Sequence, residues 1–223
     1  PVIQDLIRRH PLLCLIGNTP LAPIELFRRE LPDVNLLVKC EFLNPGGSVK
    51  DRSVLRMLAE AVTNGALPPE KTILDSSSGN AGIAYAMIGS ILDRRVELVV
   101  PGNASEERKK RIRAHGANLV LTDPVAGYDE ALREVRRRYA ANPEQYFFSD
   151  QYSNNANWQA HYDTTAEEIL AQTGGKIDWF VAGVGTGGTL TGVARRLKTA
   201  DRKIRVACIM PEEFPGIEGL KPL

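Results

Sequence analysis

Short β-rich runs alternate with stretches of helical spacing along nearly the whole chain. The runs typical of strands are NLLVKCE at 35–41, KTILDS at 71–76, RVELVV at 95–100, ANLVLT at 117–122, DWFVAG at 178–183 and IRVACIM at 204–210. The stretches with helical spacing lie near 49–64, 80–92, 104–114, 128–141, 156–172 and 189–198. Alternation of this kind predicts an α/β protein in which parallel sheets are covered by helices.

A tightly specified turn, NPGGSVKDR at 44–52, precedes the first of these helices. Pro45 fixes one backbone dihedral angle, and Gly46 and Gly47 can adopt angles that other residues avoid. The turn therefore has a defined shape and presents Lys50 at the start of the helix. We expect a bound molecule to lie close to this backbone.

Two more glycine-bearing turns join a predicted strand to a predicted helix. DSSSGNAG at 75–82 combines hydroxyl groups, an amide and free backbone N–H groups at a helix start, which suits a carboxylate or a phosphate. In GVGTGGTLTG at 183–192, glycines let backbone N–H groups approach an anion, while Thr186 and Thr189 add hydroxyl donors. The chemistry of this second turn predicts a phosphate site.

The second turn also fits the GxGxxG pattern of nicotinamide-binding enzymes, through Gly183, Gly185 and Gly188. Glu212, 24 residues after Gly188, stands where such an enzyme keeps its ribose-binding acid. A dinucleotide enzyme, however, has no use for a presented lysine and a second anion site earlier in the chain. The three turns together favour a phosphorylated aldehyde cofactor held by Lys50 as a Schiff base, with an amino acid as substrate.

Charge and composition restrict the class of partner. Lys and Arg number 28 and Asp and Glu 27, so the net charge of +1 gives no electrostatic reason to expect nucleic acid or an anionic membrane. Hydrophobic residues make up 43% of the chain, and no apolar run approaches the ~18 residues of a membrane helix. The first residues lack the pattern of a secretory signal, so we expect a cytoplasmic protein with a small-molecule partner.

The cysteines and histidines do not form a metal-binding pattern. Cys14, Cys40 and Cys208 are odd in number and far apart, which argues against a disulfide framework and against a zinc-binding pair. The histidines, His161 among them, are scattered without the spacing of metal ligands. We expect no metal, and we expect His161 to be a structural hydrogen-bonding residue.

Four segments of the chain resemble the signatures of the fold-type II pyridoxal-phosphate enzymes, in the cysteine synthase and cystathionine β-synthase branch. They are NPGGSVKDR, SSGNAG, DQYSNNANWQAHYDTTAEEI and GVGTGGTLTG. The similarity extends from IGNTPL at 16–21 to MPEEFPGIEGLK at 210–221, in the order found in the family. It implies pyridoxal 5'-phosphate as cofactor and a fold of two lobes, each a mostly parallel sheet flanked by helices.

The resemblance also implies roles for individual residues. Lys50 carries the cofactor as a Schiff base, and Asn80 contacts the oxygen on the cofactor ring. The cofactor phosphate is held by Gly185, Thr186, Gly187, Gly188 and Thr189. The carboxylate of the substrate is bound by Ser77, Ser78, Gly79, Ala81 and Gln151. Lys50 then acts as general base at the substrate Cα, a leaving group departs from Cβ, and sulfide or a thiol adds to the resulting aminoacrylate.

Two features depart from the family pattern. Cysteine synthases usually have threonine before and after the Ser-Gly-Asn core, where this chain has Ser77 and Ala81 and so loses one of the two hydroxyl groups. The sequence also ends at Leu223, before the segment in which the family supplies a serine or threonine to the pyridine nitrogen. We therefore expect a truncated or partly disordered form of a longer protein.

The lobes and the activity follow from these features. We predict a smaller lobe over residues 44–150, which carries Lys50 and Asn80, and a larger lobe over 1–43 and 151–223, which carries the phosphate site. The predicted activity is synthesis of L-cysteine from an O-activated L-serine, such as O-acetylserine, and sulfide. Two alternatives stay open: condensation of serine with homocysteine, as in cystathionine β-synthases, and a catalytically silent regulatory member of the fold. Homodimers are common in the family, so we expect a homodimer.

Overall fold

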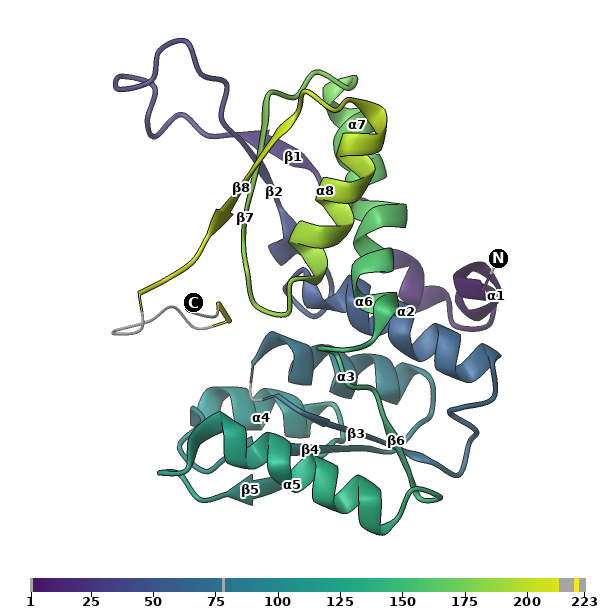
Figure 1. Cartoon of the computed structure of the whole chain (residues 1–223). Helices are drawn as coiled ribbons and strands as arrows, with labels where there is room; N and C mark the ends of the chain where they lie inside the picture. Colours follow the sequence, from purple (N-terminus) through teal and green to yellow (C-terminus); the bar gives the residue numbers. More distant parts are fainter. Residues whose placement is uncertain (1, 78, 213–218, 221–223) are drawn as a thin grey trace.

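Figure 1 shows the computed structural model of the chain, which describes residues 2–77, 79–212 and 219–220 and divides into two lobes. The lower lobe in that view is built on a four-stranded parallel sheet with the strand order β5-β4-β3-β6. Its strands are β3 (Thr72–Ser76), β4 (Val96–Pro101), β5 (Asn118–Thr122) and β6 (Tyr146–Phe148). Its helices are α3 (Asn80–Ile91), α4 (Glu106–Ala114) and α5 (Gly127–Ala141).

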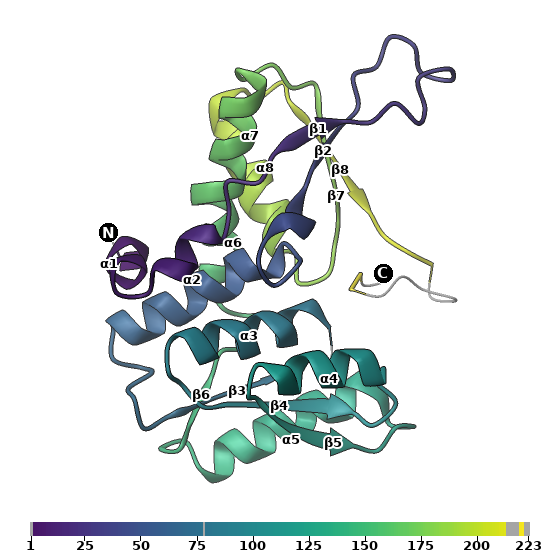
Figure 2. The same ribbon diagram turned by 180° about the vertical axis from the view of Figure 1, so that it is seen from behind.

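Successive residues of the central strand β3 enter different apolar cores. Ile73 belongs to the core that includes the buried side chains of α3, whereas Leu74 packs with Ala131 and Val135 of α5. In agreement with this, α3 and α4 lie on one face of the sheet and α5 lies on the other (Figure 2). Burial on both faces explains why β4, with the sequence VELVVP, is apolar at nearly every position.

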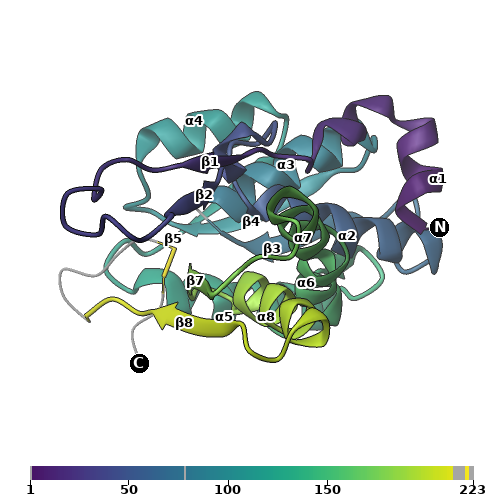
Figure 3. The same cartoon turned by 90° about the horizontal axis from the view of Figure 1, so that it is seen from above.

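The upper lobe contains two separate pairs of strands and a layer of helices. β1 (Leu21–Pro23) and β2 (Leu37–Lys39) pair in antiparallel fashion, and β7 (Trp179–Gly183) and β8 (Arg205–Ile209) pair in parallel. The helices are α6 (Asn155–Ala160), η3 (His161–Thr165), α7 (Ala166–Thr173) and α8 (Gly188–Ala200). Both strand pairs lie on one side of α7 and α8, as the view from above shows (Figure 3).

The helix α2 (Lys50–Thr63) lies between the two lobes (Figure 1). It packs against α3 of the lower lobe and α6 of the upper lobe, with α1 (Val2–Arg9) alongside. The 3-10 turn η1 (Pro11–Leu15) follows α1, and the 3-10 turn η2 (Glu41–Leu43) precedes the loop into α2. The first residue of α2 therefore stands where the two lobes meet.

The predicted strands and helices are all present, and five short elements of the described chain were not predicted: α1, η1, β1, η2 and β6. β1 and β6 have three residues each, too few for an alternating pattern to be visible, and α1 has eight. The predicted helix at 156–172 contains the π-turn η3 between α6 and α7. Within the described residues, no helix has both the length and the apolar character that crossing a membrane requires.

Candidate active site

A cleft of about 1580 Å³ is lined by residues of both lobes. Three turns reach it: the turn before α2, the turn between β3 and α3, and the turn between β7 and α8. The predicted site residues that line the cleft are Lys50, Ser77, Gly79, Asn80, Ala81, Gln151, Gly185, Thr186, Gly187, Gly188 and Thr189. Ser78 lies outside the described residues. The structure thus brings together every predicted site residue that it describes.

Lys50 opens α2 and places its amine beside the glycine-rich turn of the upper lobe. A Cβ atom added to Gly185 would lie 3.8 Å from Lys50 Nζ. The amine forms no hydrogen bond or ion pair with any residue in the described part of the chain. Burial lowers the pKa of this amine, so a larger fraction of it is neutral and nucleophilic at a given pH.

The turn between β3 and α3 places small polar groups at the start of a helix. Ser77 is buried, and its Oγ accepts a hydrogen bond from the Gly79 backbone N–H at 3.3 Å. Asn80 is the first residue of α3 and is exposed in the cleft. Gly82 has to lack a side chain, because a Cβ atom there would lie 2.2 Å from the Ser77 carbonyl oxygen. The free N–H groups and the positive end of the helix dipole favour an anion at this turn.

The turn between β7 and α8 is held in shape by Asn157. Gly187 precedes α8 with a φ of +83°, in the left-handed region that favours glycine. A Cβ atom on Gly188 would lie 2.0 Å from Asn157 Oδ1, so the two residues are in close contact. Asn157 Nδ2 donates hydrogen bonds to Thr186 Oγ1 at 2.9 Å and to the Gln151 backbone oxygen at 2.7 Å. Asn157 therefore joins the glycine-rich turn to the segment that carries Gln151.

His161 contacts the same turn from the helical layer. Its Nε2 lies 3.3 Å from Thr189 Oγ1, and its Nδ1 lies 2.9 Å from Thr165 Oγ1. Burial, together with the nearby charges of Arg52 and Lys50, lowers the pKa of His161 to about 3. A ring that stays neutral and bonds to two threonines is suited to a structural role.

Asp75 is a buried carboxyl group at the end of β3, two residues before Ser77. Its Oδ1 accepts a hydrogen bond from the Ser76 backbone N–H at 2.7 Å, but Oδ2 has no hydrogen-bond partner among the described residues. Burial raises the pKa of Asp75 to about 7, although the hydrogen bond from the Ser76 backbone N–H partly opposes this shift. A proton on Asp75 therefore stabilises the interior below the β3–α3 turn.

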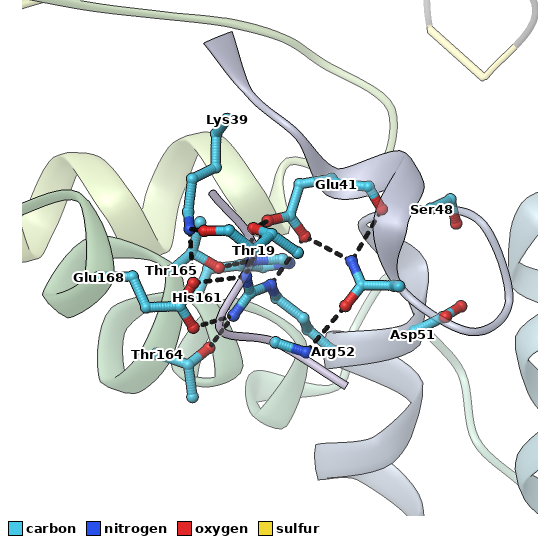
Figure 4. Close-up of polar contacts among 12 residues, drawn as sticks. Thr19, Lys39, Glu41, Ser48, Asp51, Arg52, His161, Thr164, Thr165 and Glu168 are labelled. Carbon is cyan, nitrogen blue, oxygen red and sulfur yellow. Dashed lines mark hydrogen bonds and ion pairs between the residues drawn. The ribbon is translucent and has the colours of Figure 1, made fainter. Parts of the chain in front are cut away.

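A network of largely buried charges surrounds Arg52, two residues after Lys50 in the sequence (Figure 4). Arg52 Nε donates to Glu41 Oε2 at 2.7 Å, and Arg52 Nη1 donates to Glu168 Oε1 at 2.6 Å. Lys39 Nζ lies 2.6 Å from Glu168 Oε2. Burial alone would raise the pKa of Glu168, but hydrogen bonds from Arg52 and Lys39 lower it to about 2. The network is therefore ionised at neutral pH and joins α2 to η2 and α7.

Reasoning from sequence did not find Arg52, Asn157 or Asp75. Arg52 bonds to a residue 116 positions away and Asn157 to one 29 positions away, and no local pattern marks such distant partners. The available signal for Asp75 was a charged residue placed directly after two apolar residues of a predicted strand and before three serines. Each of these residues lies in, next to or in contact with one of the three turns of the cleft.

Comparisons with known proteins show which sequences this chain resembles. The model of the family described as "Pyridoxal-phosphate dependent enzyme" matches residues 12–221. A cysteine synthase of Aquifex aeolicus is 49% identical over 216 residues, which are 96% of this chain and 66% of the relative. A cystathionine beta-synthase of Rattus norvegicus is 40% identical over 214 residues, which are 95% of this chain and 37% of the relative.

The fold of the chain also matches that of a solved structure. The crystal structure of a cysteine synthase from Entamoeba histolytica matches with a TM-score of 0.89 and 37% sequence identity, over 95% of this chain and 66% of that one. The sequence thus spans about two thirds of the length of the cysteine synthases it matches.

Proposed function

Because the chain belongs to the family of pyridoxal-phosphate-dependent enzymes, we propose that it makes L-cysteine from an O-activated L-serine, such as O-acetylserine, and sulfide. The observation that carries this proposal is the amine of Lys50, which has no hydrogen-bond or ion-pair partner among the described residues and lies beside the glycine-rich turn at 185–189. An amine and an anion site in one cleft suit a phosphorylated aldehyde. The similarity to cysteine synthases supports the choice of reaction, and the family match decides against the nicotinamide alternative.

The residues of the cleft fit pyridoxal phosphate. The backbone N–H groups of 185–189, at the start of α8, would hold the phosphate together with the two threonine hydroxyls of that turn. Gly185 leaves no space for a side chain, because a Cβ atom there would lie 2.4 Å from the Gly219 backbone oxygen. Asn80 would contact the oxygen on the ring. When bound, the cofactor withdraws electrons from the substrate Cα, which favours loss of the Cα proton and of a leaving group on Cβ.

Lys50 would act in two ways. Its lowered pKa makes the neutral amine available to bind the cofactor covalently. Once an amino acid has replaced Lys50 on the cofactor, the freed Nζ would take the proton from the substrate Cα as a general base. No other lysine of the described chain stands at the start of a helix beside the 185–189 turn.

The carboxylate of the substrate would bind at the start of α3. The backbone N–H groups of the turn can donate to it, and the helix dipole favours its negative charge. The proposed residues of this site are Ser77, Ser78, Gly79, Ala81 and Gln151. Gln151 reaches the cleft from the segment between β6 and α6, so it would bind the carboxylate from a different side than the β3–α3 turn does.

Spectra and chemical trapping test the proposal. Purified protein should be yellow from bound cofactor, and borohydride reduction followed by peptide mapping should place the cofactor on Lys50. Lys50→Ala should lose the covalent link, whereas Lys176→Ala, which removes another lysine that lines the cleft, should keep it. Addition of O-acetylserine and sulfide should then produce L-cysteine. A label on a different lysine would contradict the assignment.

Similarity to the rat cystathionine beta-synthase supports a second candidate reaction, the condensation of serine with homocysteine. The same assay with these two substrates would yield cystathionine if this alternative is correct. A protein that binds the cofactor at Lys50 but makes neither product would be a silent, regulatory member of the fold.

Three further proposals concern the whole protein. We propose that the smaller lobe extends over residues 44–150, that two copies of the chain form a homodimer, and that the protein acts in the cytoplasm. The strand pairs of the upper lobe, which leave apolar side chains exposed, support the homodimer. Limited proteolysis, light scattering and cell fractionation test the three in turn.

A further inference from the structure

The residue after Lys50 folds back on the loop that presents the lysine. Asp51 is fully buried, and its Oδ2 accepts a hydrogen bond from the Gly46 backbone N–H at 2.5 Å. A Cβ atom on Gly46 would lie 2.3 Å from Asp51 Oδ1, so only glycine leaves room for the carboxyl group. This hydrogen bond joins the loop at Gly46 to the first turn of α2.

Arg111 of α4 holds the other backbone group of the same glycine. Its Nη2 donates to the Gly46 carbonyl oxygen at 3.0 Å, and a Cβ atom on Gly47 would lie 3.2 Å from that nitrogen. Burial raises the pKa of Asp51 to about 6, while the Gly46 N–H and the charge of Arg111 favour its ionised form. Asp51 of α2 and Arg111 of α4 thus bind the backbone N–H and carbonyl groups of the same residue, Gly46.

The two residues that follow Lys50, Asp51 and Arg52, bind to different parts of the protein. Asp51 joins the loop near α4, which packs against α3 in the lower lobe. Arg52 joins η2 and α7 of the upper lobe through Glu41 and Glu168 (Figure 4). The second anchor is a network of ion pairs, whereas the first depends on one hydrogen bond from a largely exposed arginine.

We propose, building on the role proposed for Lys50, that Asp51 and Arg111 form a clamp on Gly46 that positions the lysine amine in the cleft. Arg111 is a positioning residue: it acts through the loop, from a helix that carries none of the predicted site residues. Without Arg111, the Gly46 carbonyl loses its partner and the buried Asp51 carboxylate loses a compensating charge. The loop then samples more conformations, and the amine is less often in position to react.

Hydrogen exchange of the full chain tests the clamp without any cofactor. Deuterium uptake by a peptide covering residues 44–50 should be about tenfold faster in Arg111→Met than in the wild type, since one charge-assisted hydrogen bond is lost. Asp51→Asn should also make deuterium uptake by this peptide faster. The matched control is Arg113→Met on the same helix, because the Arg113 side chain forms no hydrogen bond with any described residue. Uptake in that variant should stay at the wild-type value.

Capture of added pyridoxal phosphate tests the consequence for Lys50. Arg111→Met should slow the covalent capture about tenfold while the amount bound at saturation stays the same, and Arg111→Lys should recover part of the rate. Wild-type uptake and capture in Arg111→Met, or equal changes in Arg113→Met, would overturn the clamp. If the wild-type protein captures no cofactor at Lys50, the proposed function fails. In that case the clamp is judged from hydrogen exchange alone: it exists if deuterium uptake by residues 44–50 is faster in Arg111→Met than in the wild type.

Discussion

Asp75 is a buried group whose titration should contribute to the pH dependence of the stability of the protein. Burial raises its pKa from the ordinary 3.8 to about 7, so the folded chain keeps a proton that the unfolded chain releases at lower pH. The contribution of Asp75 to the free energy of unfolding is therefore complete below about pH 4 and is lost as the pH rises towards about 7.

Replacing Asp75 by asparagine removes this titration. We expect the free energy of unfolding of Asp75→Asn, relative to the wild type, to increase from pH 4 to pH 8 by up to about 4 kcal/mol. Urea unfolding at the two pH values measures the change. Asp178→Asn, at an exposed position, controls for the loss of one carboxyl group. A difference between variant and wild type that is the same at both pH values would show that Asp75 is ionised throughout.

Gln151 is the proposed carboxylate-binding residue whose replacement should separate binding of the substrate from binding of the cofactor. Its side chain is buried and lines the cleft, and its backbone oxygen accepts a hydrogen bond from Asn157. If the amide binds the substrate carboxylate, Gln151→Ala should weaken amino-acid binding roughly ten- to a hundredfold, as loss of a hydrogen bond to a charged group predicts. The backbone hydrogen bond remains, so cofactor binding should be unchanged.

Titration of the cofactor's visible absorbance with amino acid measures the affinity in that variant. Gln159→Ala, which removes a glutamine outside the cleft, is the control and should bind like the wild type. Loss of the cofactor in Gln151→Ala, or wild-type affinity, would exclude Gln151 from the carboxylate site.

At the level of elements, long periodic segments could be predicted and short or distant pairings could not. β4 has an apolar run of strand length, and the three glycine-bearing turns carry their chemistry in adjacent residues. β6 has three residues and is a strand because it pairs with β3 across many intervening residues. The Arg111–Gly46 contact spans 65 positions, and the basic run around Arg111 has the sequence of a solvated helix face. Such contacts depend on the tertiary fold, which local patterns do not encode.

The charge network around Arg52 should contribute strongly to the packing of α2 against η2 and α7. Arg52→Met would leave Glu41 and Glu168 without their shared cation, with side chains that are only 14% and 15% exposed. Removing one partner of a buried ion pair typically costs about 3–5 kcal/mol, so we expect a loss of that size in the free energy of unfolding. Urea unfolding at neutral pH measures it.

The control for this variant is an ion pair on the surface. Arg133 pairs with Glu130 at 2.9 Å within α5, and its side chain is 66% exposed. Arg133→Met should cost at most about 1 kcal/mol. If Arg52→Met is no more destabilising than Arg133→Met, the buried network does not hold α2 in place.

For the whole molecule, the two lobes differ in how their sheets are covered. The four-stranded sheet of the lower lobe has helices on both faces, whereas the strand pairs of the upper lobe leave apolar side chains accessible. Leu37, Trp179 and Val181 are 44%, 54% and 50% exposed and line the same cleft. Neighbouring apolar groups and open strand edges of this kind are typical of surfaces that associate.

We therefore expect the chain to self-associate through the strands of the upper lobe. Light scattering across a range of protein concentrations should show dimers or larger species, because association buries the apolar side chains of β2 and β7. The double variant Leu37→Lys and Val181→Lys should shift the protein to monomer, since a lysine ammonium group in the contact would lose its hydration. Val125→Lys is the control: Val125 is 91% exposed, in the turn before α5 of the other lobe, and its replacement should leave association unchanged. A wild-type chain that is monomeric at every concentration would contradict the prediction, and an equal effect of Val125→Lys would show that the contact lies elsewhere.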